Sequence, residues 1–224
     1  MNIRYATMAD LDDIASVESE CFPVLEAATK EEFEQRIKYY GNHFWLMFDD
    51  DKLIAFVDGF VTDEADLTDD MYENASMHNE NGAWQMIFGV NTLPEYRRCG
   101  YAKELIKKAI LDAGKQNRKG LVLTCKESLV PYYSKFGFVD EGITDKSTHG
   151  NVLWHQMRLD FKLRNNGVNP SDNKNVTANK KFAADRILSY FKEEWKVLLI
   201  ITVSGFIYNL GLLFGPWFEG KMAG

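Results

Sequence analysis

The stretch that decides the fold is Val90-Asn91-Thr92-Leu93-Pro94-Glu95-Tyr96-Arg97-Arg98-Cys99-Gly100-Tyr101-Ala102, which continues into Lys103-Glu104-Leu105-Ile106. It predicts an apolar strand that ends at Val90, a basic turn, and a helix that begins near Gly100. The first N–H groups of such a helix have no partner inside it and lie at the positive end of its dipole. Gly100 permits close approach of the backbone to a ligand. The stretch therefore predicts a turn that binds a pyrophosphate group.

The pattern Arg-x-x-Gly-x-Ala in this stretch is not specific by itself, because many helices begin after a basic turn that contains glycine. An ordinary helix start is the alternative interpretation. The spacing does exclude two other phosphate-binding motifs, since the chain has neither a Gly-x-x-x-x-Gly-Lys-Ser/Thr P-loop nor a Gly-x-Gly-x-x-Gly dinucleotide fingerprint.

The segments around this turn follow the order of one known family. They are Ile3–Thr7 with Ala9-Asp10, Lys52–Gly59, Arg97–Ala102 and Leu129–Phe138. Together they resemble the GNAT acetyltransferase superfamily over residues 1–161. Three segments are similar to the arylalkylamine (serotonin-type) N-acetyltransferases: Leu53–Phe56, Asp63-Glu64 with Leu67-Thr68, and Leu129–Phe138.

Periodicity and caps predict an α+β chain. Expected helices cover about Ala9–Cys21, Thr29–Tyr40 (opened by a Thr29/Glu32 capping box), Gly100–Lys115 and Leu129–Lys135. Expected strands cover Asn2–Ala6, Phe44–Phe48, Leu53–Val61, Ala83–Asn91, Leu121–Cys125, Phe138–Gly142 and Val152–Phe161. Helices alternate with strands and hairpins occur at both ends, which predicts a mixed, mostly antiparallel sheet flanked by helices on both faces. The resemblance implies that this arrangement is the GNAT fold.

The charge is distributed unevenly along the 224 residues. Residues 1–161 contain 17 Lys and Arg against 28 Asp and Glu, a net charge of −11, whereas residues 162–224 contain 9 against 5, a net charge of +4. An acidic body disfavours nucleic acid as a partner and favours a cationic, amine-like substrate. The long acidic segment from Thr62 to Gly82 is either a solvated face or part of the selection of an amine.

The cysteines indicate the redox state of the cellular compartment. Cys21, Cys99 and Cys125 have no paired spacing and no His partners at metal-ligand distances in the sequence. We therefore expect a reducing compartment, no disulfide and no metal. The N-terminus also lacks the basic and apolar regions of a signal peptide.

The composition changes after residue 161, which predicts three parts: a GNAT domain at 1–161, a polar linker at 162–181, and residues 182–224 with an amphipathic stretch and an apolar run. The run Val197–Phe218 contains no charge and is long enough to span a bilayer. A buried helix or dimer interface is the alternative. Basic residues before the run predict a cytoplasmic domain tethered to the inner face of the membrane. Residues 182–221 also loosely resemble the start of an ABC exporter membrane domain, so the chain could be a truncated fusion.

The resemblance implies a set of cofactor contacts for acetyl-CoA. Phe88 and Val90 would contact the pantetheine arm through the main chain, and a backbone N–H of this strand would stabilise negative charge on the thioester oxygen. The phosphate loop would consist of Arg97, Arg98, Cys99, Gly100, Tyr101, Ala102 and Lys103.

The same resemblance assigns roles near the reacting atoms. Tyr133 matches the family's tyrosine that protonates the departing sulfur, with a packed aromatic as the alternative. Phe22 resembles an aromatic of the substrate-binding loop. The histidine pair of the arylalkylamine enzymes is absent from Trp84-Gln85-Met86, so the base is unassigned; Asp58, acting through water, is a candidate, and a solvent-facing Asp58 is the alternative.

These observations predict an N-acetyltransferase that moves an acetyl group from acetyl-CoA to a primary amine, either a small amine or an arylalkylamine-like one. We expect direct attack, since neither Cys99 nor Cys125 has a histidine close in sequence. The alternatives are a non-catalytic CoA-binding or sensing module, suggested by the missing base, and an accessory domain of a membrane-transporter fusion. The sequence leaves the acceptor amine and the oligomeric state open.

Overall fold

The structure, a computed structural model, describes residues 1–148 and 152–165. Its helices are α1 (Leu11–Cys21), α2 (Lys30–Tyr40), α3 (Asp70–Glu73), α4 (Tyr101–Lys115), α5 (Val130–Ser134) and α6 (Phe161–Asn165). Its strands are β1 (Asn2–Tyr5), β2 (Phe44–Asp49), β3 (Lys52–Asp58), β4 (Val61–Thr62), β5 (Trp84–Ile87), β6 (Gly89–Thr92), β7 (Gly120–Cys125), β8 (Val139–Ile143) and β9 (His155–Asp160). The expected helices and strands occur in the predicted order in residues 1–148 and 152–160. The helix α3 was not predicted, and the expected strands Leu53–Val61 and Ala83–Asn91 are each divided into two.

The strands form two sheets. The first has the order β1-β2-β3-β6 and contains only antiparallel pairs. The second has the order β4-β5-β7-β9-β8, in which β5 and β7 are parallel and the other pairs are antiparallel. The prediction of mostly antiparallel pairing is confirmed. The prediction of one sheet is wrong, because the expected strand Ala83–Asn91 divides at Phe88 and its two halves pair with different neighbours.

Close backbone contacts mark the point where the sheets part. A Cβ atom at Gly59 would lie 1.8 Å from the carbonyl oxygen of Met86, and a Cβ atom at Gly89 would lie 2.5 Å from Oδ1 of Asp58. Only glycine fits at such distances. The N–H of Phe88 donates to the carbonyl oxygen of Asp58 at 2.8 Å, which holds the chain as it passes from one sheet to the other.

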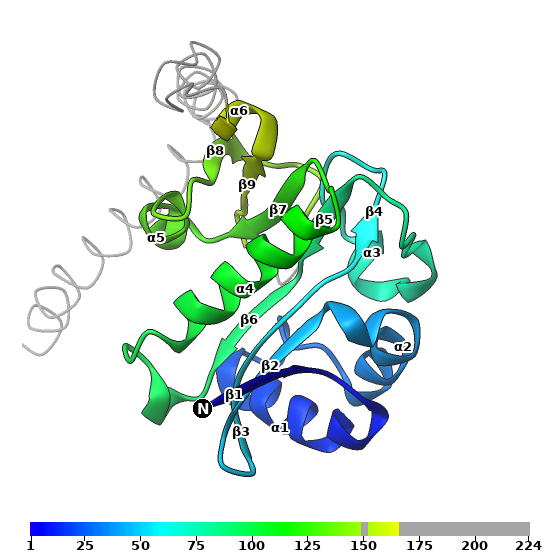
Figure 1. Cartoon of the computed structure of the whole chain (residues 1–224), viewed down its shortest axis with the longest axis vertical. Helices are drawn as coiled ribbons and strands as arrows, with labels where there is room; N and C mark the ends of the chain where they lie inside the picture. Colours follow the sequence, from blue (N-terminus) through cyan, green and yellow to red (C-terminus); the bar gives the residue numbers. More distant parts are fainter. Residues whose placement is uncertain (149–151, 166–224) are drawn as a thin grey trace, which may run out of the picture. The chain divides into compact units, whose positions relative to one another are not determined.

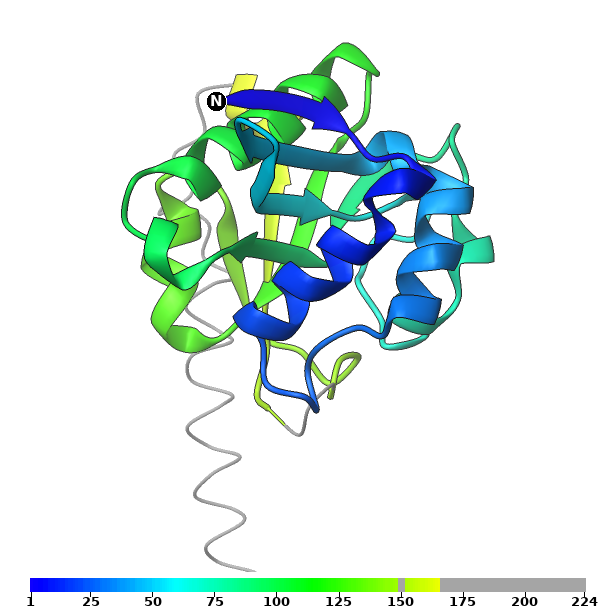
Figure 2. The same ribbon diagram turned by 90° about the horizontal axis from the view of Figure 1, so that it is seen from below.

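Helices cover both faces of the first sheet (Figures 1 and 2). Successive side chains of β2 point to opposite faces. Phe44, Leu46 and Phe48 belong to the core that α1 and α2 complete, whereas Trp45 and Met47 belong to the core that α4 completes. Because both faces are buried, the strand is apolar from Phe44 to Phe48 rather than alternating.

The cap predicted for the second helix is present. The N–H of Glu32 donates to Oγ1 of Thr29 at 3.2 Å, and the N–H of Thr29 donates to Oε2 of Glu32 at 2.6 Å. Each bond satisfies a donor that the helix itself leaves unpaired.

Regular structure continues past the expected domain end at residue 161, since α6 covers Phe161–Asn165. In residues 1–148 and 152–165, no helix has both the length and the apolar character that crossing a bilayer needs. The rest of the predicted linker 162–181, the amphipathic stretch 182–196 and the apolar run 197–218 lie outside the described residues.

Candidate functional site

The turn before α4 has the backbone geometry of an anion site. Arg98 has φ 66° and Gly100 has φ 93°, so two residues of the turn are left-handed. The bonds of α4 begin with the N–H of Glu104, which donates to the carbonyl oxygen of Gly100 at 3.1 Å. The N–H groups of Tyr101, Ala102 and Lys103 have no acceptor among the described residues. Such a concave run of N–H groups at a helix N-terminus fits a phosphate group.

The side chains of this turn add positive charge at the surface. Arg97, Arg98, Cys99 and Lys103 are all exposed. Nε of Arg97 donates to the carbonyl oxygen of Thr92 at 3.1 Å, which fixes the turn to the end of β6. The left-handed residues and the unpaired N–H groups together favour an anion site over an ordinary helix start.

Strand β6 offers main-chain groups beside this turn. It is the last strand of the first sheet, so it is paired on one side only, with β3. The N–H of Leu93 donates to the carbonyl oxygen of Ile54, and the alternation of an antiparallel ladder then turns the N–H and C=O of Val90 to the unpaired side. The N–H of Phe88 is already bonded to Asp58, so this N–H is not available to a ligand.

A cavity of about 280 Å³ opens beside the unpaired side of β6. Its lining comes from α1, α2, the loop between them, the segment 69–73, the region where β6 parts from β7, α5 and the residue before β9. Five residues that sequence analysis selected line it: Phe22, Asp58, Phe88, Val90 and Tyr133. The cavity therefore joins the expected thioester position to the expected acceptor position.

Tyr133 lies on α5, is 6% exposed, and contacts Phe138 edge-to-face with ring centroids 6.1 Å apart. Burial, and then the neighbouring Cys125, raise the pKa of its phenol well above the usual value of 10. The phenol is therefore protonated at neutral pH, as a proton donor must be. It is also a weaker acid than a free tyrosine, so donation must be coupled to the departure of the sulfur.

Cys125 lies beside Tyr133 in the same cavity. It stands opposite His155 in the β7–β9 register, a neighbour that spacing along the sequence does not reveal. Nδ1 of His155 lies 3.0 Å from Oδ1 of Asp140, and the thiol makes no hydrogen bond to His155. Burial, and then the charge of Asp140, raise the pKa of Cys125 to about 12. Cys125 stays a neutral thiol, which favours direct attack over an acyl-enzyme.

Asp58 is fully buried, so a solvent-facing position is wrong. Its Oδ2 pairs with Nη1 of Arg36 at 3.2 Å, and Nη2 of Arg36 donates to the carbonyl oxygen of Tyr72 at 2.9 Å. Glu18 of α1 is buried beside them, and its Oε1 accepts from the N–H of Ala28 at 3.1 Å. All three charged residues line the cavity.

Burial changes the proton affinity of both carboxyl groups. Burial, with the charge of Asp58 adding to it, raises the pKa of Glu18 to about 7. Burial also raises the pKa of Asp58 to about 6, although Arg36 opposes this rise. Perturbed carboxyl groups in a cavity are a frequent feature of active sites.

Sequence analysis missed Glu18 and Arg36. A signal for both exists, because Glu18 follows Ile14 by four positions and Arg36 follows Phe33 by three, so each lies on the inward face of an amphipathic helix. A charge on such a face is unusual and indicates a buried polar partner.

Comparison with known proteins identifies the family. The family model of the acetyltransferase (GNAT) family matches residues 11–138, more than half of the 224 residues. The chain belongs to the GNAT family. The comparisons support no part of the resemblance of residues 182–221 to an ABC exporter.

Individual relatives of this GNAT chain are distant. Serotonin N-acetyltransferase of Mesocricetus auratus is 29% identical over 92 residues, which cover 41% of this chain and 43% of that protein. The chain therefore spans less than half of the length of this relative. The match agrees with the expected likeness to the arylalkylamine branch.

Two solved structures share the fold of this GNAT chain. The loading GNATL domain of CurA from Lyngbya majuscula has a TM-score of 0.63 at 16% identity, covering 72% of this chain and 98% of that one. The GphF GNAT-like decarboxylase, in complex with isobutyryl-CoA, has a TM-score of 0.59 at 15% identity, covering 71% and 99%. At these identities the likeness shows the fold alone.

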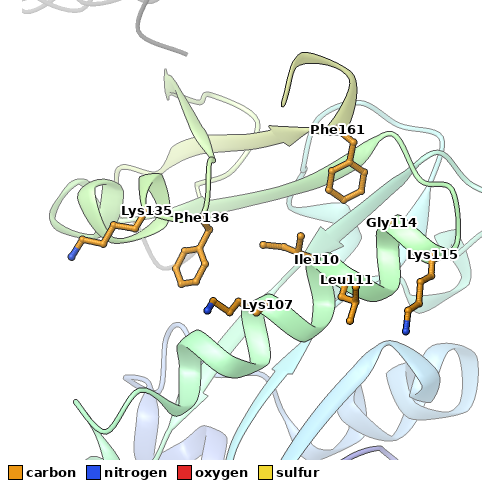
Figure 3. A pocket seen from close by; sticks show the side chains of 8 residues that line it. All are labelled: Lys107, Ile110, Leu111, Gly114, Lys115, Lys135, Phe136 and Phe161. Atoms are coloured by element: carbon orange, nitrogen blue, oxygen red, sulfur yellow. The ribbon is translucent and has the colours of Figure 1, made fainter. Parts of the chain in front are cut away.

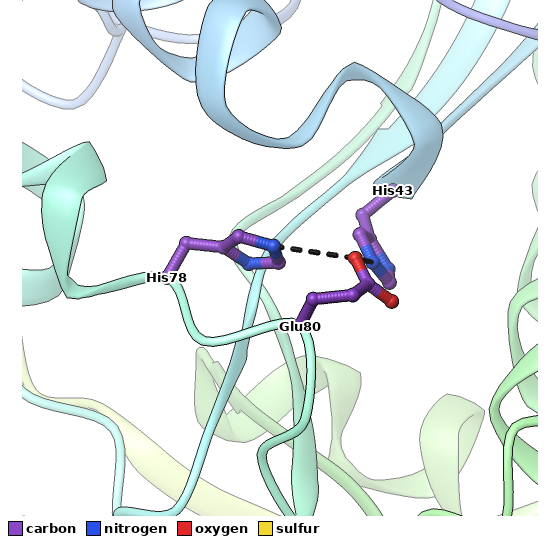
Figure 4. A group of neighbouring side chains, drawn as sticks. All are labelled: His43, His78 and Glu80. Atoms are coloured by element: carbon purple, nitrogen blue, oxygen red, sulfur yellow. Dashed lines mark hydrogen bonds and ion pairs between the residues drawn. The ribbon is translucent and has the colours of Figure 1, made fainter.

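A second cluster of titratable groups in the GNAT domain joins His43, His78 and Glu80 (Figure 4). Nε2 of His43 lies 3.0 Å, and Nε2 of His78 3.3 Å, from the same oxygen, Oε2 of Glu80. Nη2 of Arg118 donates to the other oxygen at 2.8 Å. Burial raises the pKa of Glu80, but the bond to His43 and further partners lower it by more. The pKa of Glu80 therefore lies below its usual value.

The hydrogen bonds of this cluster disfavour a metal ion. The N–H of Val61 donates to Nδ1 of His78 at 3.2 Å, so neutral His78 carries its proton on Nε2 and donates it to Glu80. A metal ion at that position would need the lone pair of Nε2. The cluster is a hydrogen-bonded ion cluster that ties the loop at Glu80 to buried His43.

A separate hollow of about 600 Å³ lies on the outer face of α4 (Figure 3). It combines three lysines (Lys107, Lys115 and Lys135) with the apolar Ile110, Leu111, Phe136 and Phe161. It shares no lining residue, among those described, with the cavity that contains Tyr133. The two hollows are therefore different sites.

Proposed function

We propose that this chain is an acetyl-CoA-dependent N-acetyltransferase that acetylates a primary amine by direct attack. The observation that carries the proposal is the single cavity, which holds the outward main-chain groups of Val90, the phenol of Tyr133 and buried carboxyl groups. Acetyl transfer needs these three components near one another: an oxyanion donor, an acid for the leaving thiolate, and a binding site for an amine.

The proposed cofactor contacts fit the geometry of the turn before α4. The unpaired N–H groups of Tyr101, Ala102 and Lys103 would hold the diphosphate, with Arg97, Arg98, Cys99 and Gly100 completing the loop. Phe88 and Val90 would each contribute a carbonyl oxygen to the pantetheine arm, which leaves the N–H of Val90 for the thioester oxygen. The GphF GNAT-like decarboxylase, which shares the fold, was solved in complex with isobutyryl-CoA, and this supports an acyl-CoA ligand.

The N–H of Val90 would stabilise the negative charge that develops on the thioester oxygen, a contribution of about 3 kcal/mol for one well-placed donor. Tyr133 would then protonate the sulfur as the C–S bond breaks. The reference pKa values of a phenol and a thiol differ by about 1.5, so donation is uphill by at least ~2 kcal/mol, and a hydrogen bond to the developing thiolate offsets part of this.

The acceptor we propose is a cationic amine with an apolar body. Several carboxyl groups line the cavity against one lining cation, Arg36: Glu18, Glu26, Glu32, Asp58, Asp69 and Glu73. They attract an ammonium group. The aromatic side chains of Phe22, Phe88 and Trp154 line the same space and would pack against the rest of the amine. The match to serotonin N-acetyltransferase of Mesocricetus auratus supports this class of acceptor.

The apolar run 197–218 remains a proposed membrane tether, supported by its length and its lack of charge. Fractionation of cells that express the full chain or a chain ending at residue 165 tests it. We expect the full chain in the membrane fraction and the short chain in the soluble fraction. A soluble full chain contradicts the tether and leaves the acetyltransferase proposal unchanged.

Release of free thiol from acetyl-CoA tests the proposed function, with a panel of arylalkylamines, diamines and peptide N-termini as acceptors. We expect thiol release that depends on the amine and an acetylated product of matching mass. A folded protein that binds CoA calorimetrically but releases no thiol with any amine would instead be a CoA-sensing module.

A further inference from the structure

We propose that Glu18 is the catalytic base of this site: its carboxylate takes the proton from the amine nitrogen, and the N–H of Ala28 holds it beside the Asp58–Arg36 ion pair. This inference rests on the proposed acetyl transfer and supplies the group that the absent histidines leave open. It concerns residues on three elements, α1, α2 and β3, that meet only in the folded chain (Figure 1).

The two oxygens of Glu18 have different environments. Oε1 accepts from the N–H of Ala28 at 3.1 Å, which fixes the side chain. Oε2 is buried and has no hydrogen bond of good geometry among the described residues; the side-chain amide of Asn91, which also lacks one, is a polar group close to this carboxylate. The residue is 5% exposed and lines the cavity. A buried oxygen that the protein leaves unpaired beside a cavity is placed to accept a proton or an N–H from a ligand.

Asp58 is the less suitable of the two carboxylates. Its Oδ2 pairs with Arg36 at 3.2 Å, and the space around its Oδ1 is limited by Gly89 and by the amide of Asn91. Arg36 is fixed in turn by its bond to the carbonyl oxygen of Tyr72. Arg36 thus neutralises Asp58 and forms no ion pair with Glu18 among the bonds described. Oδ1 of Asp58 also lacks a hydrogen bond of good geometry, so the difference between the two carboxylates is the paired cation.

The proton inventory is balanced. The amine binds as an ammonium ion and first loses one proton to water; its neutral nitrogen then forms a bond to the thioester carbon. The nitrogen loses a second proton to the carboxylate of Glu18, the C–S bond breaks, and the phenol of Tyr133 gives a proton to the sulfur. Glu18 afterwards releases its proton to water and Tyr133 takes one up, so one ammonium ion and one thioester give one amide, one thiol and one released proton.

The surroundings of Glu18 give it a base strength suited to neutral pH. The titratable groups around it are Cys21 on α1, Glu26 on the following loop, Arg36 on α2, Asp58 on β3 and Tyr133 across the cavity. Burial and Asp58 raise its pKa to about 7 and outweigh the opposing charge of Arg36. A base whose pKa lies near the working pH combines a high ionised fraction with a useful driving force.

Steady-state kinetics of Glu18→Gln test the role, with Glu20→Gln as the matched control on the exposed side of the same helix. We expect kcat/KM for the amine to fall by about 10²-fold or more, the scale of general-base catalysis. We also expect the rise in kcat/KM near pH 7 to disappear, with CoA binding measured by calorimetry unchanged. Glu18→Asp, which keeps a carboxylate, should restore part of the rate. Glu20→Gln should behave as the parent.

Three outcomes would each overturn a statement. If the parent releases thiol and Glu18→Gln does so at the same rate with the same pH profile, the base role is wrong and the acetyltransferase proposal stands. If the parent releases no thiol with any amine although it binds CoA, the proposed function fails and the base role fails with it. If Glu18→Gln is slow but keeps the pH profile of the parent, Glu18 is a structural residue only.

Discussion

Glu18 on α1 and Asp58 on β3 place two buried carboxyl groups in one cavity, and Arg36 pairs with only one of them. Two like charges in a buried site raise each other's pKa, and a single cation compensates them incompletely. This arrangement lowers the stability of the folded chain, because one carboxyl group in the cavity has no paired cation. The same carboxyl group is available to take a proton in the proposed reaction. The consequence is measurable in the folded protein without any substrate.

Glu18→Gln should stabilise the protein at alkaline pH. The folded-state pKa of Glu18 is raised from 4.5 to about 7, so the folded chain binds more protons than the unfolded chain between these values, and stability falls as pH rises through them. The variant lacks this loss. Its free energy of unfolding, relative to the parent, should therefore rise by about 2 kcal/mol between about pH 5 and about pH 8, as measured by urea unfolding.

Glu20→Gln serves again as the control, since Glu20 is exposed on the same helix. Its difference from the parent should stay constant over this pH range. If the curves of Glu18→Gln and Glu20→Gln run parallel, the carboxyl group of Glu18 is not perturbed in the folded state.

Tyr133→Phe should lower turnover by about ten- to a thousand-fold, which corresponds to about 1.4–4 kcal/mol in the barrier. The physical reason is the loss of the proton donor for the departing thiolate. Affinity for CoA should change little, since the ring and its contact with Phe138 remain. Tyr132→Phe is the matched control, because this half-buried neighbour does not line the cavity. Equal rates for Tyr133→Phe and the parent remove the phenol from the mechanism.

Gly100→Val should abolish CoA binding, and Gly100→Ala should weaken it. A Cβ at Gly100 would meet no atom within 4 Å, so the loss of binding does not come from a steric clash. It comes from the backbone, because a residue with a Cβ is strained at a φ of 93°. The turn would leave the left-handed region and redirect its N–H groups. Calorimetric titration with CoA measures this. Gly114→Ala, later in the same helix, is the control and should bind CoA as the parent does. Undiminished CoA binding by Gly100→Val would show that the turn before α4 does not hold the diphosphate.

Gly89→Ala should impair both stability and turnover. The new Cβ would lie 2.5 Å from Oδ1 of Asp58 and 3.0 Å from Nδ2 of Asn91, so the buried carboxyl group must move and its pairing with Arg36 must change. We expect a lower midpoint of urea unfolding together with a lower kcat for the amine. A variant that unfolds and reacts as the parent does would show that the Asp58–Arg36 pair can shift without affecting the site, which argues against a role of this pair in the reaction.

Much of the fold follows from local patterns. The capping box at Thr29 and the apolar runs of β2, β3 and β7 predicted these elements within a few residues. The turn from Arg97 to Ala102 could also be found from the sequence, because a phosphate cradle is made by consecutive residues of one segment. Its left-handed residue at Arg98 could not be predicted, since arginine has no preference for that conformation.

The division into two sheets is indicated less clearly by the sequence than the helices and strands are. Gly59 and Gly89 interrupt apolar strands, and both prove to lie where another part of the chain passes within van der Waals distance. A glycine in a strand indicates such an approach but does not name the partner. The strand expected at Ala83–Asn91 was therefore placed correctly, and its break at Phe88 was not expected.

The sequence by itself determined the family, the order of helices and strands, and the basic turn that we propose for the diphosphate, because each depends on residues close together along the chain. Only the tertiary structure decided that Glu18, Arg36 and Asp58 meet, and that Asp58 is buried. The reason is physical: the proton affinity of a carboxyl group depends on its burial and on nearby charges, and here both come from elements distant in sequence.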